Sequence, residues 1–118
     1  MIINLTQHVY SPEQAAAGVI NHPRQAELQA LLTFDELPSS SVIVSRAKAV
    51  TALALETGAT SAMLGGAPFF MGALERELQA AGLKALYAFS RRESVEVTDP
   101  DGFVRKTAVF RHLGFVEV

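Results

Sequence analysis

Three short segments of the sequence carry groups that suit the binding of an anion. They are Thr6-Gln7-His8, Gly65-Gly66-Ala67-Pro68 and Ser90-Arg91-Arg92-Glu93. Each of them follows an apolar segment that we expect to be a strand. Because ligands of open parallel sheets bind beyond the carboxyl ends of the strands, we expect the three segments to border one crevice.

The glycine pair lies between an expected strand and an expected helix that begins at Pro68. Backbone N–H groups and the helix dipole favour an anion at such a junction. We expect the amides of Phe69 and Phe70 to stay free in the first turn, with the two rings beside a planar base. The alternative is a tight turn whose phenylalanines face the core, since the spacing matches neither GxxxxGK[ST] nor GxGxxG.

Arg91 and Arg92 follow the apolar segment 83–89, and a guanidinium group binds phosphate or carboxylate oxygens through two hydrogen bonds. Further along, Asp99-Pro100-Asp101-Gly102 is typical of a hairpin turn. A turn centred on Pro100-Asp101 would pair Ser90 with Arg111 and Arg91 with Phe110.

In that register one end of the hairpin would gather arginines 91 or 92, Arg111 and the nearby His112. Strand alternation would send some of these side chains to the opposite face. The alternative is a solvated hairpin whose arginines form ion pairs with acidic neighbours: Glu93, Glu96 or Glu117.

Candidates for acid–base or nucleophilic chemistry are His8, His112 and Ser90, although a lone histidine in a loop is more often structural. The chain has three histidines and no cysteine, and its histidines follow neither the HxH nor the HExxH spacing. We therefore expect no metal site and no cofactor. A GxSxG nucleophile motif is also missing.

Composition restricts the class of protein. The chain has 118 residues, 49% of them hydrophobic, and a net charge of −2, which argues against general DNA or RNA binding. A local basic patch would still suffice for a nucleotide or a short oligonucleotide. The longest apolar run, 62–74, contains glycine and proline and is too short to span a bilayer, and the first residues do not resemble a signal peptide. We expect one cytoplasmic domain over residues 1–118.

The pattern of residues predicts an α/β fold. Strands are expected at 2–6, 61–64, 83–89 and 114–118, and a hairpin at 93–98 and 104–110. Helices are expected from Ser11 to near Gly18, from residues 21–23 onward, over 41–57 and over 68–81. We expect a three-layer, Rossmann-like domain whose mostly parallel sheet ends in a C-terminal antiparallel hairpin, with the apolar segment 83–89 covered on both faces.

Three motifs carry a resemblance to a known group: Ile3-Asn4-Leu5-Thr6-Gln7-His8, Leu64-Gly65-Gly66-Ala67-Pro68 and Tyr87-Ala88-Phe89-Ser90-x-Arg92-x-Ser94. The chain resembles a family of short, uncharacterised bacterial and phage proteins, which implies no particular activity. In its topology it is also similar to the Rossmann-like CARF domains of CRISPR-associated proteins. That similarity implies a cyclic oligoadenylate ligand at the strand ends, and in some cases its cleavage.

Three hypotheses follow. The first is a binding domain for an anionic, nucleotide-like ligand that uses a set of residues from all three segments and the hairpin: Thr6, Gln7, Gly65, Gly66, Phe69, Ser90, Arg91, Arg92 and Arg111. The second is a metal-independent phosphodiesterase similar to a ring nuclease. The third is an interaction module without a small ligand that dimerises through a sheet edge or the Phe69-Phe70 region. We expect a homodimer in each case.

Overall fold

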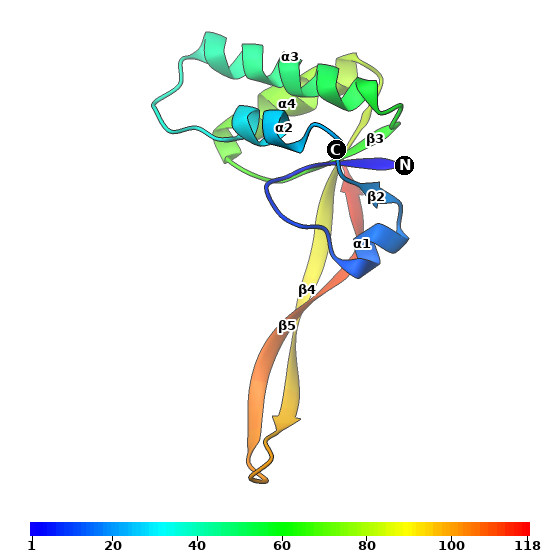
Figure 1. Cartoon of the computed structure of the whole chain (residues 1–118), viewed down its shortest axis with the longest axis vertical. Coiled ribbons are helices and arrows are strands. Elements are labelled where there is room, and N and C mark those ends of the chain that lie inside the picture. The colour runs from blue at the N-terminus through cyan, green and yellow to red at the C-terminus, as the bar shows by residue number, and fades with distance from the viewer.

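A computed structural model describes residues 1–118 of the chain (Figure 1). Five strands form one sheet in the order β2-β1-β3-β4-β5. The pairs β1–β2, β1–β3 and β3–β4 are parallel, and β4–β5 is antiparallel. The elements are β1 (Ile2–Leu5), α1 (Pro12–Ala16), β2 (Val19–Ile20), α2 (Gln25–Leu32), α3 (Ser40–Glu56), β3 (Ser61–Leu64), α4 (Pro68–Ala80), β4 (Lys84–Thr98) and β5 (Val104–Glu117).

Short-range signals begin and end α1, α3 and α4 close to where the sequence predicts, whereas α2 begins at Gln25, after the predicted 21–23. Ser11 caps α1 through a reciprocal pair of hydrogen bonds with Gln14. Ser39 accepts a hydrogen bond from the Val42 amide at the start of α3, so the β-branched residues that follow are helical. After α3, Gly58 has a φ of +74°, a conformation that few residues other than glycine adopt.

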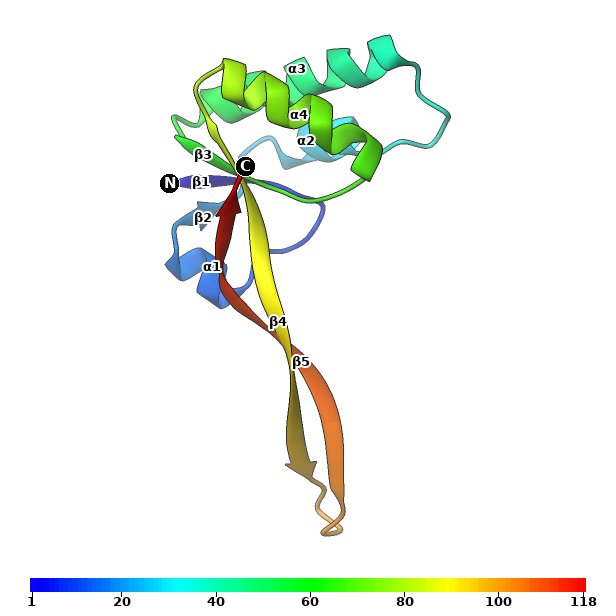
Figure 2. The same cartoon turned by 180° about the vertical axis from the view of Figure 1, so that it is seen from behind.

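The main core lies between the sheet and the three longer helices. Figures 1 and 2 show α2, α3 and α4 together on one side of the sheet. Fully buried side chains from both layers meet there, among them Ile3, Leu5, Leu28, Val50, Phe70, Leu74 and Leu78. This burial is the principal stabilising contribution and fixes the face of the sheet that each strand residue occupies.

The opposite face of the sheet has much less cover, because α1 is the one helix on that side (Figure 2). Met63 and Leu86 are neighbours in the strand register on this face and are nearly buried. The mixed α/β fold and the mostly parallel sheet with its C-terminal antiparallel pair are confirmed. The predicted three-layer, Rossmann-like arrangement is not.

Strand β2 is not among the predicted elements. It consists of Val19 and Ile20, which pair in parallel with Ile2 and Ile3 at the outer edge of β1. The pairing is parallel because α1 returns the chain to the end of the sheet at which β1 begins, so β2 runs in the same direction as β1. Two residues are too few to show the alternation by which a strand is predicted.

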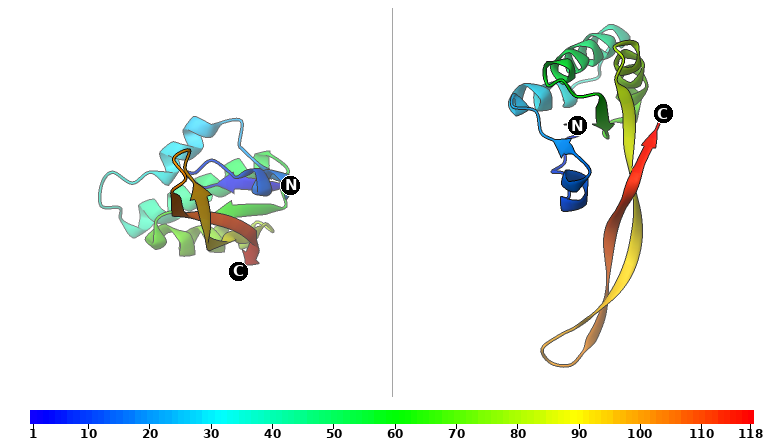
Figure 3. Two further views of the ribbon diagram at one scale, coloured as in Figure 1. Left: turned by 90° about the horizontal axis from the view of Figure 1, so that it is seen from below. Right: turned by 90° about the vertical axis from the view of Figure 1, so that its right-hand side faces the viewer.

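Strands β4 and β5 continue far beyond the sheet as a two-stranded ribbon (Figures 1 and 3). They contain 15 and 14 residues, and the molecule measures 57 Å along its longest axis. The sequence predicts four separate strands here, whereas the structure has two continuous ones. The prediction that segment 83–89 is covered on both faces holds only as far as Leu86, because Ala85 and Leu86 are buried on opposite faces whereas Phe89 is 55% exposed.

The ribbon turn confirms the predicted hairpin but changes its register. Asp99 and Phe103 pair through a backbone hydrogen bond of 2.7 Å, and the Gly102 amide donates to the Asp99 carbonyl. The loop therefore holds three residues, Pro100, Asp101 and Gly102, the last with a φ of +84°. As a result Arg91 pairs with Arg111 and Ser90 with His112, one position from the predicted register.

None of the helices is long and apolar enough to cross a membrane.

Candidate functional site

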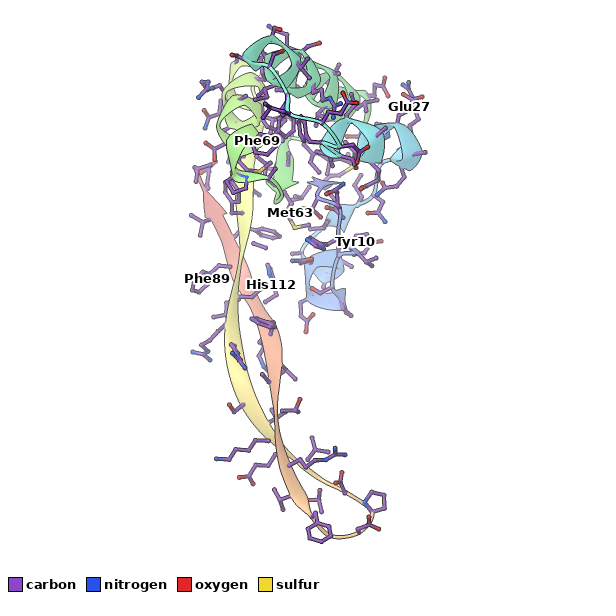
Figure 4. The ribbon with its side chains drawn as sticks, turned by 90° about the vertical axis from the view of Figure 1, so that its left-hand side faces the viewer. Tyr10, Glu27, Met63, Phe69, Phe89 and His112 are labelled. Atoms are coloured by element: carbon purple, nitrogen blue, oxygen red, sulfur yellow. The ribbon has the colours of Figure 1, made fainter.

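A cleft of about 870 Å³ lies where β1 and β3 end and the ribbon begins. One wall is the segment between β1 and α1 with the start of α1, and the other is the base of the ribbon. In Figure 4, His112 points from the ribbon toward the side on which Tyr10 and α1 lie, and Met63 points into the same space. The lining residues are Thr6, His8, Val9, Ser11, Gln14, Met63, Leu64, Gly65, Tyr87, Ala88, Ser90, Phe110 and His112.

The wall after β1 is held by a network around Asn4, whose side chain is fully buried. The Asn4 amide group donates to the His8 carbonyl at 3.0 Å and to the Asn21 side chain at 3.2 Å. The Asn4 side-chain oxygen accepts bonds from the Thr6 amide and the Thr6 hydroxyl, at 3.0 and 2.7 Å. Satisfied buried polar groups of this kind specify one loop conformation, so the backbone that carries His8 is fixed.

The end of β3 contacts this wall through Gly65. A Cβ atom added to Gly65 would lie 3.3 Å from the Thr6 methyl group, so the close approach of the two segments depends on the missing side chain. Gly66 does not line the cleft, and its φ of +154° lies at the edge of the region that favours glycine. Glycine is needed at position 65 for space.

The ribbon wall comes from one of the ribbon's two faces, which we call the cleft face. In antiparallel pairing, opposed residues share a face. The cleft face therefore holds Ser90 with His112 and Arg92 with Phe110, continued by the pairs Ser94 with Ala108, Glu96 with Lys106 and Thr98 with Val104. The reverse face holds Arg91, Glu93, Val95, Val97, Arg105, Thr107, Val109 and Arg111.

His112 sits at the centre of this wall. Its ring packs edge-on against Phe115, with centroids 4.8 Å apart. The Nδ1 atom of His112 is buried and has no hydrogen-bond partner. A buried polar atom without a partner costs free energy, which a ligand group hydrogen-bonded to it would recover.

Tyr87 lines the cleft from β4. Its hydroxyl donates to a Glu75 carboxylate oxygen of α4 at 2.6 Å. Burial of the phenol, reinforced by the neighbouring Glu75 carboxylate, raises the pKa of Tyr87 well above its ordinary value. The phenol is therefore neutral at physiological pH, and its ring packs against the main core on the helix side of the sheet.

A family model described as the Uncharacterized protein MJ1673 family matches residues 1–116. The chain belongs to this family. The match supports the resemblance to an uncharacterised family, and it does not confirm the three motifs or the similarity to CARF domains. Neither the search of curated proteins nor the search of solved structures found a significant match.

Five predicted site residues of this MJ1673-family chain come together at the cleft: Thr6, His8, Gly65, Ser90 and His112. Others lie elsewhere. The Gln7 side chain donates to the Thr33 hydroxyl at 2.8 Å. Phe69 packs edge-on against Phe34 with centroids 5.0 Å apart, and the amide of Phe70, predicted to be free, donates to the Ala67 carbonyl.

The predicted arginines divide between the two ribbon faces. Arg91 and Arg111 lie on the reverse face, where each donates to Glu93, at 2.9 and 2.8 Å. This arrangement is the solvated alternative considered above. The hydrogen bond from Arg91, reinforced by that from Arg111, lowers the pKa of Glu93. Arg92 lies on the cleft face beyond the lining residues and forms no ion pair in the chain.

Several lining residues were not predicted as site residues. The sequence predicts Ser11 only as the start of a helix and Gln14 only as a residue inside it, and it predicts Met63, Tyr87 and Phe110 only as residues of strands. Strand alternation distinguishes two faces, but it does not tell which of them the helices leave open. The histidine, aspartate and glutamate side chains form no cluster of three that would hold a metal ion.

Proposed function

We propose that the cleft binds a small nucleotide-like molecule with a planar body and at least one anionic group. The observation that carries the proposal is the make-up of the cleft. Two imidazoles, two serine hydroxyls, a threonine and the Gln14 side chain border a space of about 870 Å³ together with apolar residues, and no carboxylate lines it. Small-molecule sites combine apolar walls with a few polar groups in volumes of roughly 300–1,000 Å³.

The two walls suggest how such a ligand lies. Phe110 is 76% exposed and, with Met63, offers apolar surface for a planar ring. His8 and His112 come from opposite walls of the cleft, and the buried Nδ1 atom of His112 would bind a polar ligand group once the ring turns.

The test is a thermal-shift series with inorganic phosphate, nucleosides and nucleoside monophosphates. A ligand at a hundred times its Kd stabilises the fold by about 2.7 kcal/mol, which raises the Tm of a domain of this size by several degrees. We expect nucleoside monophosphates to give the largest shift, and the substitution His112→Ala to remove it. The matched control is Arg111→Ala, next in sequence but on the reverse face, which should keep the response.

Absence of a shift with every compound, or equal loss in both variants, would contradict the proposal. A second candidate is metal-independent phosphodiester cleavage, favoured by the placement of His8 and His112 on opposite walls with Ser90 beside them. Turnover of short linear or cyclic oligonucleotides in EDTA, lost in both His8→Ala and His112→Ala, would establish that activity over binding alone.

A further inference from the structure

The part of the ribbon from Ser90 to His112, which we call the arm, extends away from the core of the chain. No residue after Leu86 is buried, and the arm bears large exposed apolar side chains, including Phe103, Val104 and Phe110 at 71%, 59% and 76%. A two-stranded ribbon by itself is at best marginally stable in water. An arm of this length therefore favours a structure in which another surface covers it.

The two faces of the arm differ in how their charges are satisfied. On the reverse face Arg91 and Arg111 pair with Glu93, and Arg105 pairs with Asp99 at 2.8 Å. On the cleft face Arg92, Glu96 and Lys106 form no ion pair within the chain. The exposed rings and aliphatic groups of Phe110 and Val104 lie on this same face.

The order of residues on the cleft face makes it complementary to itself. Ser94 and Ala108 form the middle pair of the five, and both side chains are small. Arg92 lies two positions before Ser94 and Glu96 two positions after it. A two-fold axis at the middle pair, perpendicular to the strands, would bring Arg92 of each copy opposite Glu96 of the other.

We propose that the cleft face of the arm docks on the cleft face of a second copy of this chain, in antiparallel orientation about that axis. Opposite charges then meet at two symmetric places, and the small central residues allow close approach. The surface contains cations and an anion in alternation, which suits a second copy better than a uniformly charged partner such as a nucleic acid.

The docked arm also completes the ligand cleft. The same axis places Thr98 and Val104 of the partner subunit over Ser90 and His112, at the mouth of the cleft. The second copy would thus cover the side of the cleft that the short α1 leaves open. This docking mode differs from the dimerisation through a sheet edge or the Phe69-Phe70 region that the sequence analysis considers.

The test is a charge-reversal series followed by light scattering after size exclusion, without ligand. We expect the wild-type chain to have about twice the 12.7 kDa mass of one copy. Arg92→Glu alone and Glu96→Arg alone should each raise the dimer dissociation constant at least ten-fold. The double variant R92E/E96R should restore the dimer, since it re-forms both pairs. Arg91→Glu, on the reverse face, is the matched control and should stay dimeric.

All three substituted positions, Arg91, Arg92 and Glu96, are exposed, so circular dichroism should show folded protein for every variant. A wild type that is still monomeric at about 100 μM protein, roughly a hundred times a Kd of 1 μM, would overturn the proposal. Single variants that stay dimeric would also overturn it. So would a double variant that remains monomeric. A dimer without any ligand response would contradict only the proposed function, and a ligand-responsive monomer only the docking.

Discussion

At the scale of single residues, Gly65 connects the two segments that border the cleft. A methyl group at this position would meet the Thr6 methyl group at 3.3 Å. Thr6 is nearly buried, and its amide and hydroxyl both bond to Asn4, so it has little freedom to move aside. We expect Gly65→Ala to lower the free energy of unfolding by about 1–2 kcal/mol, through overpacking.

Urea denaturation measures this change, with Gly72→Ala as the control. Gly72 lies inside α4, and an added Cβ would meet only the flexible end of Arg76, at 3.4 Å. Alanine there should stabilise the helix by roughly 0.5–1 kcal/mol. If the two substitutions change stability in the same direction, the contact between Gly65 and Thr6 does not constrain the site.

At the scale of elements, Glu93 links the two strands at the base of the ribbon. Its hydrogen bonds from Arg91 and Arg111 lower its pKa in the folded protein. A carboxylate with a lowered folded pKa contributes stability above its unfolded pKa, and the contribution is lost as pH falls through the folded value. We expect the stability that these two hydrogen bonds add to the ribbon to be lost only in strongly acidic solution.

An NMR titration of the Glu93 side-chain carboxyl carbon measures this effect. The carboxyl should titrate below its ordinary pH range in the wild type, and close to that range in a variant carrying Arg91→Gln and Arg111→Gln. High salt should reduce the difference, because exposed ion pairs are screened. Identical titration curves for the two proteins would show that the bonds do not persist in solution.

The elements also show how far the sequence predicts this fold. Capping signals at Ser11 and Pro68, the glycine after α3 and the Asp-Pro-Asp-Gly turn act over a few residues, so the limits of α1, α3 and α4 and the presence of the hairpin are predicted closely. The start of α2 lies at Gln25, after the predicted 21–23. The register is one position off because Gly102 adds a third residue to the loop. β2 and the uncovered sheet face depend on tertiary packing, for which local periodicity holds no signal.

The residues of the candidate site also divide into those that a local rule predicts and those whose position depends on the strand register. The rule that ligands bind beyond strand ends leads to Thr6, His8, Gly65 and Ser90, all of which line the cleft. The arginines were chosen for their chemistry, but their position depends on strand alternation counted from the turn. With the corrected register, Arg91 and Arg111 lie on the face away from the cleft.

At the scale of the whole molecule, a packed α/β core and a long arm without buried residues share one chain. Their backbone hydrogen bonds should open with different free energies, since local opening depends on how much apolar surface holds a segment in place. The arm proposed here as the docking surface is the segment whose opening a second copy would suppress. Amide hydrogen exchange can therefore detect docking residue by residue.

In the monomer-forming variant Arg92→Glu, we expect amides of the outer arm, residues 94–98 and 104–108, to exchange at least a hundred-fold faster than those of β1 and β3. In the wild-type dimer the exchange rates of the same amides should be lower, by about ten-fold for each 1.4 kcal/mol of docking free energy. The matched control is the double variant R92E/E96R, whose arm should regain protection. An arm as well protected as the core in the variant that stays monomeric would show that the ribbon is stable by itself and has no need of a second copy.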